Sequence, residues 1–204
     1  MLNLFFFQTA KEKDIRLPSD ILPVSYNLQI VPFIISDNFT ISGTVSIELT
    51  CVKDTTNITL HSKKIEINDV NVMDASGNEV SIDGHYLDPE RDLLVVKMMK
   101  PLSAGSNYTL GIEFVSELSE GLSGFYRSTY TDDSGKRITM ATTHFEPTSA
   151  RKAFPCFDEP ALKATFEISL GRTRSMVALS NMPVKEGQSG VKMYDSLIHS
   201  TVLT

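Results

Sequence analysis

The chain has 204 residues, of which 41% are hydrophobic and 22% charged, with a net charge of −6 and an isoelectric point near 5.2. This length and composition are typical of a globular protein that can bury a substantial core. Because phosphate contacts need clustered Lys and Arg, which this acidic chain lacks, we exclude nucleic acid as a partner.

Residues 1–15 are expected to form a loose lead-in to one β domain over residues 16–204. The apolar start is shorter than the core of a signal peptide, and no basic residue precedes it. It is interpreted either as the remnant of a longer signal or anchor, or as a strand or tail. No stretch reaches the length of a membrane-spanning helix.

Beyond residue 16 the apolar residues mostly recur with period two. Residues 44–51 and 108–114 alternate cleanly, and residues 65–72 are interpreted as a strand with a bulge at Asn68 and Asp69. The continuous apolar run at residues 93–96 predicts a strand that is covered on both faces.

Turn signals recur at short intervals, which predicts an all-β fold of many short, mostly antiparallel strands in a sandwich or open barrel. Residues 148–154 are the best helical candidate, and residues 191–204 are interpreted as a final strand.

Three Asn-x-Thr sequons are candidate glycosylation sites, at Asn38, Asn57 and Asn107. In each case the alternating apolar neighbours are expected to face inward, which turns the asparagine toward solvent. We hypothesise a glycosylated chain that is extracellular or at the cell surface, as a plasma-membrane ectodomain. Treatment of the native protein with an N-glycosidase should then lower its mass.

The chain lacks the sequence motifs that are typical of metal or nucleophilic catalysis. Cys51 and Cys156 are interpreted as small buried hydrophobes, although their spacing does not forbid a disulfide. No two of the four histidines are close enough to share a helix face, and no His-Glu-x-x-His motif is present; they are His61, His85, His144 and His199. We therefore predict no catalytic residue and no metal ligand set in this chain.

The chemically dense stretch is residues 140–160, which begins as a strand. On that strand His144 and Glu146 would share one face. A carboxylate there can bind a cation, such as the α-amino group of a peptide, but Glu146 can equally be part of a solvated turn. Three prolines in the stretch favour a rigid loop; they are Pro147, Pro155 and Pro160.

Other residues of this stretch are expected to hold the loop in place. Charged side chains are predicted to form local ion pairs, namely Arg151, Asp158 and Glu159. The apolar residues are predicted to pack beneath the loop, namely Phe154, Cys156 and Phe157.

Residues 143–151 read THFEPTSAR, and FPCFDEP follows at residues 154–160, with Lys163 and Ala164 after it. These motifs resemble the stretch T-Q-F-E-P-T-x-A-R and its continuation in the N-terminal domain of the M1 family of zinc aminopeptidases. The likeness extends to Leu17-Pro18, Leu22-Pro23 and Tyr26, to GFYRS at residues 124–128 and to ALSNMP at residues 178–183.

The resemblance implies a saddle-like β-sandwich that packs on a zinc-binding catalytic domain. It also implies that Glu146 binds the N-terminal amine of a peptide substrate and that His144 lines the pocket for the first substrate residue. The family usually has Gln where this chain has His144, and a histidine is bulkier and can become charged near neutral pH. We therefore hypothesise an altered side-chain preference or a pH-sensitive pocket.

The family's other catalytic parts are missing from this sequence. They are the Gly-Ala-Met-Glu-Asn stretch, the zinc helix, the third zinc ligand and a tyrosine that stabilises the oxyanion. The resemblance implies that zinc is bound in the full-length enzyme and not by this chain, whose partners would be the peptide N-terminus and the missing catalytic domain. It also allows a dimer of the full-length form.

Three interpretations remain open at this point. The chain is the substrate-recognition domain of an aminopeptidase, or a truncated, non-catalytic glycosylated β-module that binds a protein partner, or part of a relative with a different activity. The second would leave an exposed apolar face on the chain.

Overall fold

The computed structural model describes residues 16–34 and 39–183, together with the backbone of residues 196–203. Within these ranges the chain is almost entirely β-structure, as the alternating pattern predicts, and no helix is long and apolar enough to cross a membrane. The predicted lead-in at residues 1–15 and the sequon asparagine Asn38 lie outside the described residues.

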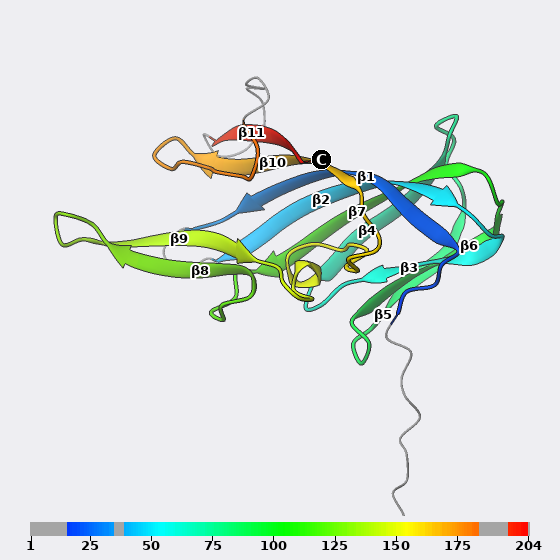
Figure 1. Cartoon of the computed structure of the whole chain (residues 1–204), viewed down its shortest axis with the longest axis horizontal. Helices are drawn as coiled ribbons and strands as arrows, with labels where there is room; N and C mark the ends of the chain where they lie inside the picture. The colour runs from blue at the N-terminus through cyan, green and yellow to red at the C-terminus, as the bar shows by residue number, and fades with distance from the viewer. Residues whose placement is uncertain (1–15, 35–38, 184–195, 204) are drawn as a thin grey trace, which may run out of the picture.

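The largest sheet has six strands in the order β11-β10-β1-β2-β7-β4 (Figure 1). Its strands are β1 (Ile21–Pro32), β2 (Thr40–Cys51), β4 (Glu66–Asp74), β7 (Asn107–Glu117), β10 (Thr165–Thr173) and β11 (Ser196–Leu203). All neighbours are antiparallel except β1 and β10, which run parallel. The final strand predicted for residues 191–204 is thus confirmed over β11.

A second sheet has the order β3-β6-β5, with strands β3 (Thr55–His61), β5 (Ile82–Asp88) and β6 (Leu93–Leu102). Its central strand β6 contains the continuous apolar run, and all four residues 93–96 are buried, as predicted. Apolar side chains from both sheets form one buried cluster, which includes Leu60 and Leu94 from the small sheet and Ile47 and Leu110 from the large one. The two sheets therefore share a core, which makes the molecule a β-sandwich.

Strands β8 (Gly124–Thr131) and β9 (Arg137–His144) form a separate hairpin that extends from one end of the molecule (Figure 1). The chain leaves β9 through a cis peptide bond between Glu146 and Pro147 and then makes a single 3-10 turn, η1 (Ala150–Lys152). The helix predicted for residues 148–154 is therefore shorter than expected, and at its end Pro155 disfavours a helical backbone at Phe154.

The period-two pattern predicts the packing of individual strands well. Every second residue of β2 is buried from Ile41 to Cys51, while Ser42, Thr44 and Glu48 are exposed. In β4 the register against β7 shifts between Ile67 and Asp69, so the predicted bulge is confirmed.

The two cysteines are free and buried, which confirms their interpretation as small core residues. Burial raises the pKa of both thiols. They are therefore held as neutral thiols, in keeping with a packing role.

Gly43 of β2 provides the space for the largest fully buried side chain. A Cβ atom added there would lie 2.3 Å from Cζ of Phe114 on the neighbouring strand β7. Such an atom forces the ring or the backbone to move, and overpacking of this kind costs roughly 1–3 kcal/mol.

We therefore predict that Gly43→Ala lowers the free energy of unfolding by about 2 kcal/mol in urea titrations followed by circular dichroism. Gly121 is the matched control, because no atom lies within 4 Å of the place that a methyl group would take there and its backbone is not left-handed. Gly121→Ala should change stability by less than about 0.5 kcal/mol. Adding Phe114→Leu to Gly43→Ala should recover part of the loss; strictly additive losses would contradict this packing account.

Candidate functional site

Glu146 lies two residues after the last residue of β9, on the segment that leads from the hairpin to η1. Its side chain is exposed, and among the described residues its carboxylate forms no hydrogen bond or ion pair. Because β9 ends at His144, strand alternation does not set the direction of Glu146, so the expectation that the two residues share a strand face does not hold. The carboxylate is nevertheless free to accept hydrogen bonds from a cation.

His144 is the last residue of β9 and stands opposite Gly124, the first residue of β8. Its side chain is exposed, and its Nδ1 lies 3.1 Å from the backbone carbonyl oxygen of Leu122. A carbonyl can only accept, so Nδ1 carries the proton in this contact and Nε2 of the neutral ring is left as an acceptor. This bond fixes the orientation of the ring.

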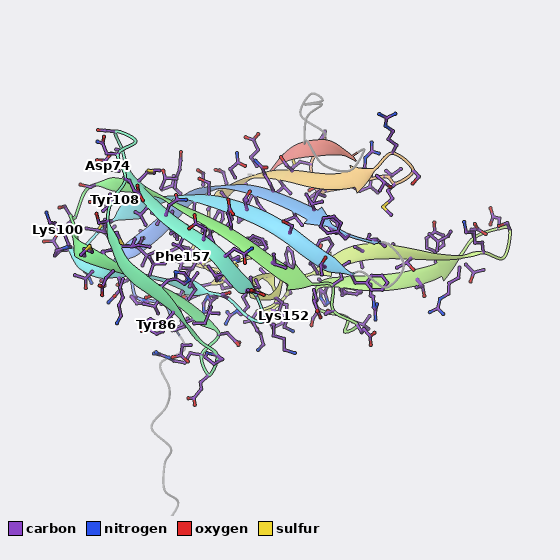
Figure 2. All side chains as sticks on the ribbon, turned by 180° about the vertical axis from the view of Figure 1, so that it is seen from behind. Asp74, Tyr86, Lys100, Tyr108, Lys152 and Phe157 are labelled. Carbon is purple, nitrogen blue, oxygen red and sulfur yellow. The ribbon has the colours of Figure 1, made fainter. Side chains whose placement is uncertain are left out.

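The turn before β8, residues 119–124, supports His144. The hydroxyl of Ser119 donates to the carbonyl oxygens of Gly121 and Ser123, at 3.3 and 3.2 Å. Nζ of Lys152 donates to Oγ of Ser123 at 2.8 Å and so joins this turn to η1. In Figure 2, Lys152 lies where the hairpin joins the rest of the molecule. His144 and the loop that follows it are thus tied to the same turn.

Arg151 and Asp158 form the predicted ion pair across the loop. Nε of Arg151 lies 2.8 Å from Oδ2 of Asp158, and each side chain is only 12% exposed. A second bond runs from Nη2 of Arg151 to the carbonyl oxygen of Asp158 at 3.2 Å. This mostly buried pair holds the two ends of the loop together.

Glu159 also forms an ion pair, but its partner is not local. Its Oε2 lies 2.8 Å from Nε of Arg16, and its Oε1 accepts the backbone N–H of Leu17 at 2.6 Å. The prediction of a local pair is wrong for this residue, since the fold brings the start of the described chain to the loop across 143 residues. Glu159 therefore joins the domain's first residues to the site.

The apolar residues of the loop are buried beneath it, as predicted, namely Phe154, Cys156 and Phe157. The ring of Phe154 makes edge-to-face contacts with Tyr26 and Phe145, at centroid distances of 6.4 and 6.1 Å. The hydroxyl of Tyr26 accepts the backbone N–H of Phe157 at 3.1 Å. Phe157 lies well inside the molecule in Figure 2, so the loop is part of the core rather than a surface excursion.

His61, which the sequence did not single out, is a further part of this arrangement. It is the last residue of β3, is 1% exposed, and pairs through its backbone with Cys156 of the loop. Its Nδ1 accepts the backbone N–H of Asp158 at 3.2 Å. The sequence holds no signal for this contact, because the two residues are 97 positions apart.

The donor set for a metal is missing from the part of the chain that the structure describes: no group of three or more His, Cys, Asp and Glu side chains could hold an ion there. His61 is buried at the end of β3, whereas His85 and His144 belong to β5 and β9. His199 lies on β11, of which only the backbone is described. The described histidines therefore do not form a zinc site with one another.

Two of the three sequon asparagines lie in the described residues, and both are exposed. Asn57 is in β3, and Asn107 is the first residue of β7, where its Oδ1 accepts the hydroxyl of Thr50 at 2.9 Å. Their side-chain amides are accessible to a modifying enzyme.

Comparison with known proteins places these features in context. A family described as the Peptidase M1 N-terminal domain matches residues 22–199. The thyrotropin-releasing hormone-degrading ectoenzyme of Rattus norvegicus is 40% identical over 172 residues, which cover 84% of this chain and 16% of that protein. Aminopeptidase N of Canis lupus familiaris is 38% identical over 82% of this chain and 18% of its own length.

Endoplasmic reticulum aminopeptidase 1 of Homo sapiens is 38% identical over 83% of this chain and 18% of its own length. The chain thus spans less than a fifth of the length of these relatives.

The ion pair of the loop gives a direct stability prediction. Asp158→Asn leaves the charge of Arg151 mostly buried without its partner, which should lower the free energy of unfolding by about 3 kcal/mol in guanidinium titrations. Glu120→Gln is the control, because Glu120 pairs with Arg127 while its own side chain is 78% exposed. It should cost less than about 1 kcal/mol. Equal losses in the two variants would contradict a special role for the Arg151–Asp158 pair.

Proposed function

This chain belongs to the family of M1 peptidase N-terminal domains, and from that membership we propose that it is the substrate-recognition domain of a zinc metalloaminopeptidase. The enzyme removes N-terminal residues from peptides, and this domain contributes the carboxylate that binds the substrate's free amine. The observation that carries the proposal is the exposed carboxylate of Glu146, which has no partner among the described residues and lies next to a loop that is anchored in the core.

The chemistry of an α-amino group matches that carboxylate. An ammonium offers three N–H donors and a full charge, and a carboxylate accepts two or more of them in charge-assisted hydrogen bonds. Such a contact is useful for selecting peptide ends only if the carboxylate is held in place. Glu146 meets this condition, because Arg151, Asp158 and the buried aromatic residues hold the loop that follows it.

His144 is proposed to line the pocket for the first substrate residue. Its ring is held by the Leu122 carbonyl through Nδ1, and its Nε2 has no partner among the described residues. A glutamine amide at this position would offer both a donor and an acceptor, whereas the neutral ring so oriented offers an acceptor alone. This difference supports a changed ranking of N-terminal residues relative to family members with glutamine.

One face of the β8–β9 hairpin is a candidate contact surface for a partner of this domain. Strand pairing puts Tyr130, Ile138 and Met140 on one face, while Phe125 and Arg127 lie on the other. The second face is turned to the sandwich, since Phe125 is buried and Arg127 stacks on Phe39. Tyr130 and Met140 are 52% and 40% exposed. We assign this first face to the contact with the catalytic domain of the longer polypeptide.

The catalytic zinc belongs to that domain, where it would supply an activated water. The residues described here contribute recognition only. The alternative is a truncated, non-catalytic glycosylated module that uses the same exposed face for another protein. Detection of a catalytic domain in the native polypeptide, by peptide mapping of its C-terminal part, separates the two.

Cell-surface or extracellular localisation is part of the proposal. It is supported by the exposed Asn57 and Asn107 sequons and by a relative that is named as an ectoenzyme. An endoplasmic reticulum aminopeptidase is also among the relatives, and both locations lie on the secretory route.

The first test is Glu146→Gln in the polypeptide that includes the catalytic domain. The change keeps the shape and removes the charge, so kcat/KM for an unblocked peptide should fall about 10- to 100-fold, as expected for the loss of a charge-assisted hydrogen bond. The measurement is hydrolysis of aminoacyl fluorogenic substrates at about pH 7.5, where an α-amino group is still largely charged. An unchanged kcat/KM would remove Glu146 from the recognition of the amine.

His144→Gln is the matched variant for that experiment. It should keep overall activity while changing the order of preference among N-terminal residues. If both variants lost activity equally on every substrate, the separate roles proposed for Glu146 and His144 would be wrong.

Glycosylation is tested by expressing the chain in a secretory eukaryotic host. Asn57→Gln and Asn107→Gln should each lower the intact mass by one glycan, and N-glycosidase should remove what remains. Thr50→Ala, which removes the hydrogen bond to Asn107 without altering the sequon, should leave the glycan count unchanged. A mass that matches the bare polypeptide would contradict the extracellular assignment.

A further inference from the structure

A buried histidine joins the recognition loop to the sandwich. The backbone N–H of His61 donates to the carbonyl of Cys156 at 2.8 Å, and the N–H of Cys156 donates back at 3.0 Å. The imidazole Nδ1 then accepts the N–H of Asp158 at 3.2 Å. Three consecutive contacts therefore run from one residue of β3 to the loop.

The next residues of the chain extend this attachment. The backbone N–H of Lys63 donates to the carbonyl of Arg151 at 2.8 Å, on the other arm of the loop. Because Arg151 is itself paired with Asp158, residues 61–63 contact both arms of the loop that begins after Glu146. Release of this attachment would free the segment that carries the carboxylate.

A histidine is a costly residue for simple packing at this place. Since Nδ1 accepts a hydrogen bond, Nε2 carries the proton in the neutral ring. That atom is buried and has no hydrogen-bond partner among the described residues. A buried donor without a partner destabilises the fold, a cost that an apolar ring would not carry. What histidine adds is a hydrogen-bond acceptor, Nδ1, that can no longer accept once it is protonated.

Charged groups surround the ring on several sides. Arg151 lies on η1, Asp158 and Glu159 follow on the same loop, and Asp92 precedes β6. Burial, and after it the Arg151 guanidinium, lower the pKa of His61 to about 4, although the three carboxylates act in the opposite direction. The closed loop therefore holds His61 in its neutral form at neutral pH.

We propose that His61 is a positioning residue for Glu146, and that its protonation releases the recognition loop in acidic surroundings. Protonation places a hydrogen on Nδ1, directly against the N–H of Asp158, so that two donors face each other. The new positive charge also lies near Arg151. The link to Glu146 rests on the proposed function, whereas the release of the loop does not.

The direction of the pH effect follows from the two forms of the loop. In an opened loop the ring returns to water, where a histidine has its ordinary pKa of about 6.5. The closed form binds the proton less tightly, so its stability is fully present above about pH 6.5 and is lost as the pH falls toward 4. Between about pH 7.5 and 4.5 the ratio of open to closed loop should rise roughly 50- to 100-fold.

Hydrogen exchange of the backbone amides tests the release in this chain. The quantities measured are the protection factors of the amides of Cys156 and Asp158, corrected for intrinsic exchange, over the same pH range. These protection factors should fall roughly 50- to 100-fold as the pH falls from about 7.5 to 4.5, while the amides in the centre of β7 stay protected. Constant protection of the loop over this range would overturn the proposal.

Two variants separate titration from packing. In His61→Asn the amide oxygen can take the place of Nδ1 as acceptor but cannot be protonated, so protection should no longer depend on pH. In His61→Phe the acceptor is absent, so protection should be low at every pH. The carboxylates near His61 and Arg151 are present in both variants. If the protection factors of His61→Asn fell with pH as much as those of the wild type, the pH effect would belong to these groups and not to His61.

The kinetic readout uses the polypeptide that includes the catalytic domain. KM for an unblocked peptide should rise below about pH 6.5 in the wild type and rise less in His61→Asn, with kcat changed in the same way in both. If exchange shows the release but Glu146→Gln has no effect on activity, the proposed function fails and the release stands. If Glu146→Gln acts as expected but KM has the same pH profile in His61→Asn, the positioning role fails alone.

Discussion

The segment after the β8–β9 hairpin contains three prolines, at positions 147, 155 and 160, so it cannot continue as an interior strand of either sheet. Much of it is nevertheless buried, and buried backbone groups must find hydrogen-bond partners. The end of β3 provides them through His61 and Lys63, and Tyr26 of β1 provides another. This attachment fixes the loop that follows Glu146, because it holds residues 151, 156, 157 and 158 to the sandwich.

The hairpin and the loop stabilise one another. Arg127 of β8 lies over the ring of Phe39, Lys152 of η1 reaches the turn that begins β8, and Leu122 in that turn holds His144. Gly124 has a left-handed backbone and a Cβ there would lie 2.8 Å from Cβ of Lys152, so a side chain at this junction would push the hairpin from the loop. The close approach explains how a two-stranded hairpin that extends beyond the sandwich keeps a defined orientation.

The sequence predicted the features that depend on residues close together in the chain. Alternation predicted β2 and β7, a break in alternation predicted the bulge in β4, and an unbroken apolar run predicted β6. It was less successful where partners are far apart in the chain. The contacts of Glu159 with Arg16 and of His61 with Asp158 depend on how whole strands are ordered, and no period or spacing records that order. The motif at residues 143–151 predicted a candidate site, but the contacts that hold its loop come from β1 and from the end of β3.

A carboxylate that selects a cation needs two properties that usually exclude each other: a fixed position and unused acceptor capacity. Asp158 is fixed, but its oxygens are committed to Arg151. Asp74 accepts the backbone N–H of Asn78 and Asp132 accepts the hydroxyl of Ser134, each within its own turn, and these bonds lower the pKa of each carboxyl group. Glu146 differs, because buried rings and an ion pair of neighbouring residues hold the loop, while its own oxygens form no hydrogen bond or ion pair with the described residues. In the role proposed for Glu146, this arrangement accounts for the length of the motif, since a single exposed glutamate could not be both held in place and available to a cation.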